Sequence, residues 1–173
     1  MAASIARKKA FGIGLTDAVA VLFILGVPAL SHLTSVPFYL LDPMRLAVLG
    51  ALLASRSRVN GLVLAVALPL VSFAISGHPV FPKCLVIAAE LSVNVLFFVW
   101  LERMFSDRRF GVGIAAFASI LLSKAFYYGL KALVLGAGLM QMELVSTALW
   151  VQLVVAVLIS AGFAFIWRSD RSQ

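Results

Sequence analysis

The chain has 173 residues, of which 63% are hydrophobic and only 12% are charged. Soluble domains are about half apolar and about a quarter charged, so this composition excludes a soluble globular protein. A formal net charge of +7 would suggest nucleic-acid binding in a soluble chain. In a membrane protein, the topology explains such an excess of Lys and Arg, and no nucleic-acid partner is expected.

Runs of about 18 or more apolar residues are typical of transmembrane helices. By this criterion the chain contains six spans joined by short connections, which predicts one all-α membrane domain over residues 1–173. The predicted spans are residues 14–31, 38–54, 59–75, 84–101, 112–136 and 144–167. The first span is longer than a signal-peptide core and has no small-residue cleavage site followed by polar sequence, so we expect it to be retained.

Lys and Arg residues are distributed unevenly around these spans. If the N-terminus is cytoplasmic, ten of the 14 Lys and Arg residues lie on the cytoplasmic side. These ten are Arg7, Lys8, Lys9, Arg56, Arg58, Arg103, Arg108, Arg109, Arg168 and Arg171. Only Lys83 lies in an outer loop. The positive-inside rule therefore predicts that both termini lie in the cytoplasm. We expect a multi-pass protein of a bacterial plasma (inner) membrane.

Several polar side chains lie within the predicted spans, where they are costly and usually mark a functional site. Glu90 and Asn94 are one helical turn apart, and Lys124, Tyr128 and Lys131 follow one stripe of their helix. Following the direction of each span places this set at the middle or in the outer half of the bilayer, where it can face a common cavity. The candidate substrate-binding residues are Arg45, Phe81, Glu90, Asn94, Lys124, Tyr128, Lys131 and Gln152.

The charges of this set predict the ligand. Arg45, Lys124 and Lys131 oppose only Glu90, which leaves an excess of about two positive charges if all are ionised, and a buried unpaired cation is unfavourable. A small anionic ligand with a carboxylate would neutralise part of this excess. The structural alternative is that Glu90 pairs with Arg45 or a lysine while Lys131 extends to the outer surface.

Motifs for other chemistry are missing from the sequence. No GxxxxGK[ST] phosphate loop and no HExxH metal motif occurs, and Cys84 is the single cysteine, so an intramolecular disulfide is excluded. We therefore expect no catalytic residues, no metal and no cofactor, and ATP hydrolysis only in separate partner subunits.

The stretch from residue 69 to residue 155 resembles the substrate-specificity subunits (S components) of energy-coupling factor vitamin transporters, in particular the pantothenate-type branch. The first part of the match is Pro69, Ser72, Gly77, Pro79, Phe81, Pro82, Glu90 and Leu91. The family's Gly-Arg-x-x-Tyr-Gly pattern corresponds to Ser123–Gly129, with Lys124 in place of the arginine, and Trp150–Leu153 echoes a Leu-Gln pattern. The family's glycine on the helix with Glu90 is absent, since Val93-Asn94-Val95 stands there.

This resemblance implies a six-helix bundle that captures a vitamin or vitamin precursor on the outer side. It also implies a membrane coupling subunit and two ATPase subunits as partners. In that family, small residues of the first helix contact the coupling subunit through an Ala-x-x-x-Ala pattern. Gly12, Thr16 and Ala20 have the matching spacing here, with packing inside the protein's own bundle as the alternative.

Two other functions remain open from the sequence. A membrane scaffold of the rod-shape-determining type would use its polar groups for helix contacts and bind no ligand. An independent secondary carrier is disfavoured by the small size and by the lack of a visible internal repeat.

Overall fold

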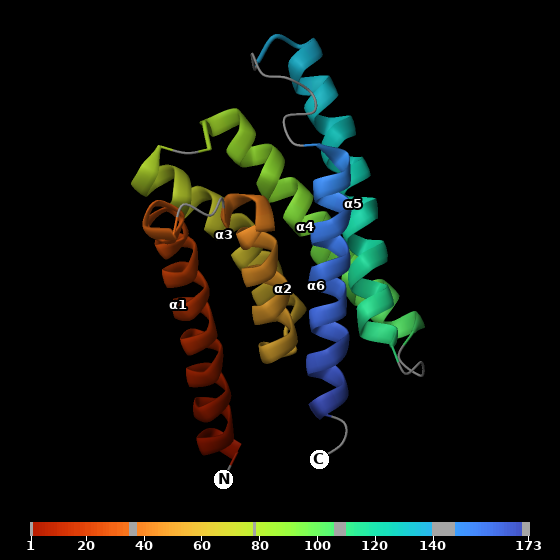
Figure 1. Ribbon diagram of the computed structural model, residues 1–173. Coiled ribbons are helices and arrows are strands. Elements are labelled where there is room, and N and C mark those ends of the chain that lie inside the picture. The colour runs from red at the N-terminus through yellow and green to blue at the C-terminus, as the bar shows by residue number, and fades with distance from the viewer. Residues whose placement is uncertain (1, 35–37, 78, 106–109, 140–147, 171–173) are drawn as a thin grey trace.

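The computed structural model describes residues 2–34, 38–77, 79–105, 110–139 and 148–170. Its helices are α1 (Ala2–Thr34), the short 3-10 helix η1 (Phe38–Leu41), α2 (Pro43–Ser55), α3 (Arg58–Ser76), α4 (Phe81–Met104), α5 (Gly111–Gly136) and α6 (Leu149–Asp170). Within these ranges the structure contains helices and no strands. Both termini lie at the same end of the bundle, as Figure 1 shows. The protein is an all-α, polytopic membrane protein, as the sequence predicts.

In the described part of the chain, five helices are long and apolar enough to cross a membrane, whereas α2 is shorter. The predicted span over residues 38–54 is divided between η1 and the 13-residue helix α2. Asp42 separates them with a left-handed backbone (φ 51°), and Pro43 begins α2. Proline has no backbone N–H to continue a preceding helix and fixes its own φ, so it suits a helix start. The start of the predicted span 144–167 lies partly outside the described residues.

Local sequence explains how α3 begins and ends. Ser57 caps α3 by accepting a hydrogen bond from the backbone N–H of Asn60 at 3.3 Å. At the other end of α3, Gly77 adopts a positive φ of 69° and its N–H donates to the Phe73 carbonyl. A left-handed residue at this position is the usual way to end a helix, and glycine adopts it without steric cost.

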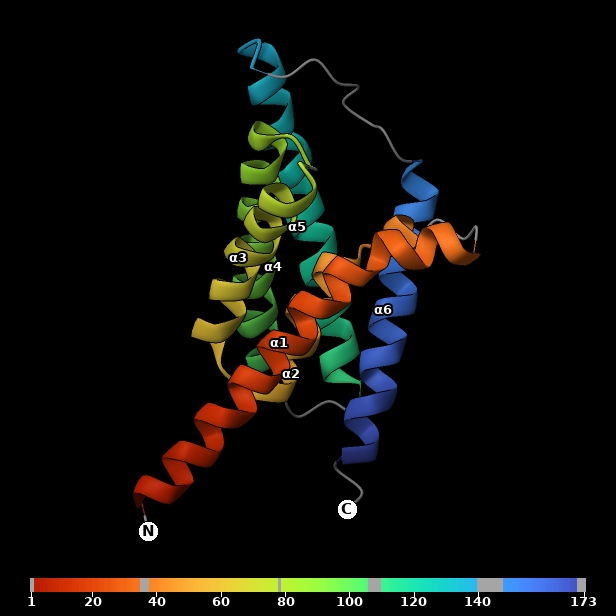
Figure 2. The same cartoon turned by 90° about the vertical axis from the view of Figure 1, so that its left-hand side faces the viewer.

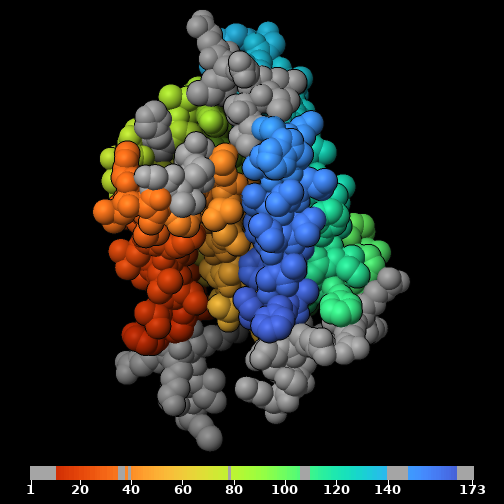
Figure 3. All heavy atoms as spheres, viewed as in Figure 1, coloured from red at the N-terminus to blue at the C-terminus, as the bar shows by residue number. Residues whose placement is uncertain are grey.

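The core lies where α2, α3, α4 and α5 meet. α4 packs against α3 and α5, α5 packs against α6, and α1 covers α2 and α3. Figure 2 shows α1 crossing the bundle obliquely, and in Figure 3 α2 forms a strip between α1 and α6. Val48, Leu49, Leu68, Val95 and Ala115 are fully buried at the centre of this core.

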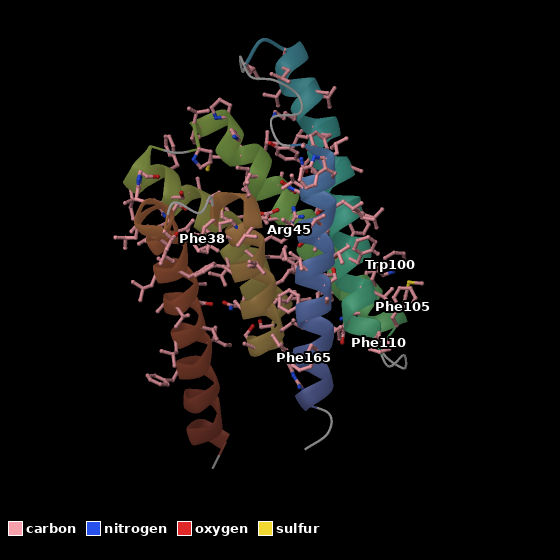
Figure 4. All side chains as sticks on the ribbon, in the orientation of Figure 1. Phe38, Arg45, Trp100, Phe105, Phe110 and Phe165 are labelled. Atoms are coloured by element: carbon pink, nitrogen blue, oxygen red, sulfur yellow. The ribbon has the colours of Figure 1, made fainter. Side chains whose placement is uncertain are left out.

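Large apolar side chains cover the outside of the bundle. Phe11, Leu22, Leu33, Trp100 and Phe165 are each more than half exposed. Figure 4 shows Trp100 and Phe110 at the edge of the bundle and Arg45 among the helices. Such a surface is unstable in water but matches the hydrocarbon of a bilayer.

Candidate functional site

A buried ion pair joins α2 to α4. Arg45, in the first turn of α2, and Glu90, in the third turn of α4, are 1% and 3% exposed. An Arg45 Nη atom donates a hydrogen bond to Glu90 Oε1. Each charge offsets the desolvation cost of the other, so this pair fixes both side chains in position.

Asp42 and Lys124 extend this pair into a network of four charges. The Lys124 ammonium lies 3.1 Å from Glu90 Oε1 and 3.3 Å from Asp42 Oδ2, and Asp42 Oδ2 lies 3.4 Å from Arg45 Nε. Asp42 and Lys124 are about a quarter exposed, in contrast to the buried Arg45 and Glu90. The network therefore has a closed inner pair and an accessible outer pair.

The accessible side of the network faces a cavity of about 340 Å³. Its lining residues come from η1, α2, α4, α5, α6 and the segment before α4. Apolar walls are provided by Leu91, Ile120, Val155 and Ile159, among others. A concave, mostly apolar site with a few convergent polar groups is the usual form of a small-molecule site.

Five of the eight predicted binding residues line this cavity. They are Arg45, Glu90, Lys124, Tyr128 and Gln152. The Gln152 amide donates to the Tyr128 hydroxyl, which links α6 to α5 at the cavity wall. The structure thus brings these side chains together from four helices, as the sequence predicts, while their role in binding stays a prediction.

The other three predicted residues lie elsewhere. Phe81 is 51% exposed and packs on Phe73, with ring centroids 5.7 Å apart. Asn94 is fully buried between α4 and α5, where its amide donates to Ser119 Oγ at 3.2 Å. Lys131 is 1% exposed, with its ammonium 5.7 Å from the centre of the Tyr127 ring.

The burial of the two lysines on α5 differs from the expectation. The structural alternative has Lys131 extending to the outer surface, yet its side chain is buried, whereas Lys124 is 25% exposed. Both ammonium groups lie over the Tyr127 ring, at 5.4 Å for Lys124 and 5.7 Å for Lys131. Lys124 also lines the cavity, where it pairs with Asp42 and Glu90, whereas Lys131 does not line it. Lys124 is therefore the more accessible cation.

Two charged residues of the cavity, Asp42 and Lys83, were not predicted. Asp42 precedes Pro43, a pattern that is typical of a helix cap, so its sequence gives little sign of a site. Lys83 precedes Glu90 by seven residues, which places both on one face of α4. This spacing could have indicated that Lys83 belongs to the site. From the sequence, Lys83 is instead expected in an outer loop, whereas in the structure it belongs to the first turn of α4.

Asp42 and Lys83 change the net charge of the site, from which the charge of the ligand was predicted. Arg45, Lys83 and Lys124 oppose Asp42 and Glu90, so the cavity lining has one excess positive charge rather than about two. Among the described residues, Lys83 has no carboxylate within 4.0 Å, and it lies one turn from the start of α4. The unneutralised charge of the lining is therefore on Lys83.

The predicted partner-binding residues on α1 divide between two environments. Ala20 is buried, and Thr16 and Ala20 line an apolar groove between α1 and α2. Gly12 is exposed, and its carbonyl accepts a hydrogen bond from the Thr16 hydroxyl at 3.0 Å. Ala20 therefore packs within the bundle, and contact of this stripe with a coupling subunit remains a prediction.

No protein-family model, curated protein sequence or solved structure matches this chain. The fold and the charged cavity therefore define the protein only as a helical, multi-pass membrane protein with a partly open polar cavity between its helices.

Proposed function

We propose that this protein is the substrate-binding subunit of an energy-coupling factor importer in a bacterial plasma membrane. It captures a small vitamin or vitamin precursor with one carboxylate from the outer side. A separate membrane coupling subunit and two ATPase subunits then drive uptake.

One observation carries this proposal: residues of the three segments that resemble S components converge on one cavity. Pro79 and Glu90 come from the first segment, Lys124 and Tyr128 from the second, and Gln152 from the third. These segments are far apart in the sequence, so their meeting at a single cavity is not a consequence of local packing. It supports a ligand site rather than scattered helix contacts.

The charge of the lining supports a ligand with a single negative charge. Arg45 and Lys124 are already opposed by Glu90 and Asp42, and the remaining charge is that of Lys83. A bound monocarboxylate would make the site neutral, which minimises the electrostatic cost of holding charges in a low-dielectric interior. A cavity of about 340 Å³ is at the small end of the range of ligand pockets, about 300–1,000 Å³.

Matched pairs of ligands test this proposal on the purified full-length protein. Pantothenate, nicotinate and biotin each have a neutral analogue in which an alcohol or amide replaces the carboxylate. We expect at least one acid to bind, with its neutral analogue at least tenfold weaker, because about 1.4 kcal/mol is tenfold and one charge-assisted hydrogen bond contributes about 1.5–3 kcal/mol. Native mass spectrometry of gently extracted protein should also detect a co-purified anion.

The competing scaffold function predicts a different result. A scaffold would use the network of Arg45, Glu90 and Lys124 only to hold helices together. It would bind neither member of any pair and would carry no co-purified small molecule. Equal binding of an acid and its neutral analogue would support a pocket but refute the monocarboxylate.

A further inference from the structure

Asp42 precedes α2, but its backbone conformation is unusual for an aspartate at the start of a helix. An aspartate at the N-cap normally has an extended backbone, and its carboxylate accepts a hydrogen bond from a backbone N–H of the first turn. Here Asp42 has φ 51° and ψ 58°, and its side chain makes no cap hydrogen bond. Left-handed backbone is disfavoured for residues other than glycine, although aspartate tolerates it better than most.

The Asp42 carboxylate is used inside the cavity instead. Its Oδ2 atom lies 3.3 Å from Lys124 Nζ and 3.4 Å from Arg45 Nε. The contact with Arg45 is within ion-pair distance but is not a hydrogen bond, and Nε has no hydrogen-bond partner among the described residues. An unsatisfied donor on a side chain that is 1% exposed is unfavourable. Asp42 therefore supplies a negative charge next to Arg45 Nε but does not accept the hydrogen bond that Nε can donate.

We propose that Asp42 is an internal competitor that holds the carboxylate subsite between Arg45 Nε and Lys124 Nζ until a ligand carboxylate displaces it. This inference rests on the proposed function and specifies where the carboxylate binds. Asp42 is 26% exposed and precedes the helix rather than lying within it, so it can move without unfolding α2.

The displaced side chain has a second favourable position. Once released, and with its backbone changed from left-handed to extended, Asp42 can accept a hydrogen bond from the backbone N–H of Met44 or Arg45, the ordinary capping arrangement for α2. The incoming carboxylate satisfies Arg45 Nε and keeps the ion pair with Lys124, and Lys83 balances the additional charge. Displacement thus gives Arg45 Nε the hydrogen-bond partner that it lacks and leaves no carboxylate unpaired.

The substitution Asp42→Asn tests this idea because it should tighten binding, an unusual result for a residue that lines a binding site. Asparagine keeps the size of the side chain, tolerates left-handed backbone and still caps a helix. It removes the charge that competes for Arg45 and Lys124. When a competent state is only partly populated, apparent affinity falls by that fraction. We expect pantothenate, nicotinate or biotin to bind the variant roughly fivefold tighter or more, which is about 1 kcal/mol at 1.4 kcal/mol per tenfold.

A matched control separates displacement from a general effect of charge. Asp17→Asn makes the same chemical change far from the cavity, where Asp17 accepts a hydrogen bond from the Asn60 amide at 2.7 Å. It should leave the affinity for these acids unchanged. The gain for Asp42→Asn should lie in the association rate and should persist at about 1 M salt, where a Debye length of about 3 Å removes long-range attraction.

The outcomes distinguish this inference from the function on which it rests. If the unmodified protein binds one of the acids and Asp42→Asn binds it equally or more weakly, Asp42 contacts the ligand or only supports the fold, and the inference is wrong while the proposed function stands. If neither protein binds any of the three acids, both fail. If the gain disappears at high salt or also occurs in Asp17→Asn, long-range charge explains it, and the competitor role is refuted.

Discussion

The buried pair of Arg45 and Glu90 gives the sharpest test of how this bundle is held together. We expect Arg45→Met and Glu90→Met each to destabilise the protein, because each leaves a charge at a site 1–3% exposed. Breaking a buried ion pair by removing one partner costs about 3–5 kcal/mol. The double substitution removes both charges and fills the space with apolar side chains of similar length, so it should lie within about 1 kcal/mol of the unmodified protein.

The structure also predicts which single substitution is worse. After Arg45→Met, Glu90 retains Lys124 at 3.1 Å. After Glu90→Met, Arg45 retains only Asp42 at 3.4 Å, without a hydrogen bond. The loss from Glu90→Met should therefore be the larger, and toward the upper part of the range of about 3–5 kcal/mol.

Thermal unfolding and denaturant titration in a mild detergent measure all four proteins of this double-substitution cycle. Two single losses of about 3 kcal/mol or more and a double loss of about 1 kcal/mol or less imply a coupling of at least about 5 kcal/mol between the two positions. Independent sites add to within about 0.5 kcal/mol, so a coupling of this size is readily measured. If the double variant loses the sum of the two single losses, the residues do not act as a pair, and the network described here is wrong.

Further predictions address topology, the binding cation, coupling and helix packing. Reporter fusions at Gln173 and near Pro79 should report opposite sides of the membrane, with Gln173 inside; an external C-terminus would invert the site. Lys124→Met should weaken binding of the preferred acid by roughly tenfold or more in calorimetry, since about 1.4 kcal/mol is tenfold, and unchanged affinity would exclude this cation from the site. Reconstituted alone in liposomes, the protein should bind but not accumulate that acid, and uphill uptake without ion gradients would contradict a separate energy source. Gly113→Ala should lower thermal stability, because its Cβ would lie 2.7 Å from that of Ala164, whereas Gly129→Ala, which meets no atom within 4 Å, should not; equal effects of the two would refute close packing of α5 on α6.

Hydropathy alone predicts the helices of this protein well. The predicted spans 59–75, 84–101 and 112–136 each lie within an observed helix and miss its ends by three residues or fewer. The span 38–54 was wrong in its first part, because the Asp42-Pro43 step interrupts it. A run of apolar residues predicts the length of a hydrophobic segment, but the backbone conformation at a proline determines where the helix begins.

The site was harder to predict than the helices because lipid and protein interior are equally apolar. A transmembrane helix therefore carries little hydrophobic signal of which face points inward. Asn94 lies one turn beyond Glu90, yet it faces Ser119 rather than the cavity. Lys131 lies two turns beyond Lys124 and is the more buried of the two. The spacing correctly places Lys124 and Tyr128 together at the cavity, but Lys131 does not line it. The orientation of each helix in the bundle determines which polar side chains reach the cavity.

The shortness of α2 has an electrical consequence. Its 13 residues at 1.5 Å per residue give about 20 Å, against about 30 Å for the hydrocarbon core of a bilayer. If water fills the cavity above α2, the insulating layer beneath it is roughly a third thinner than the surrounding bilayer, and the membrane potential falls across that layer rather than within the water-filled cavity. The same potential over about 20 Å instead of about 30 Å makes the local field roughly 1.5-fold stronger. Voltage would therefore act mainly on the step that carries an anion across this layer, at up to about 2.3 kcal/mol per charge per 100 mV, and only weakly on occupancy of the cavity.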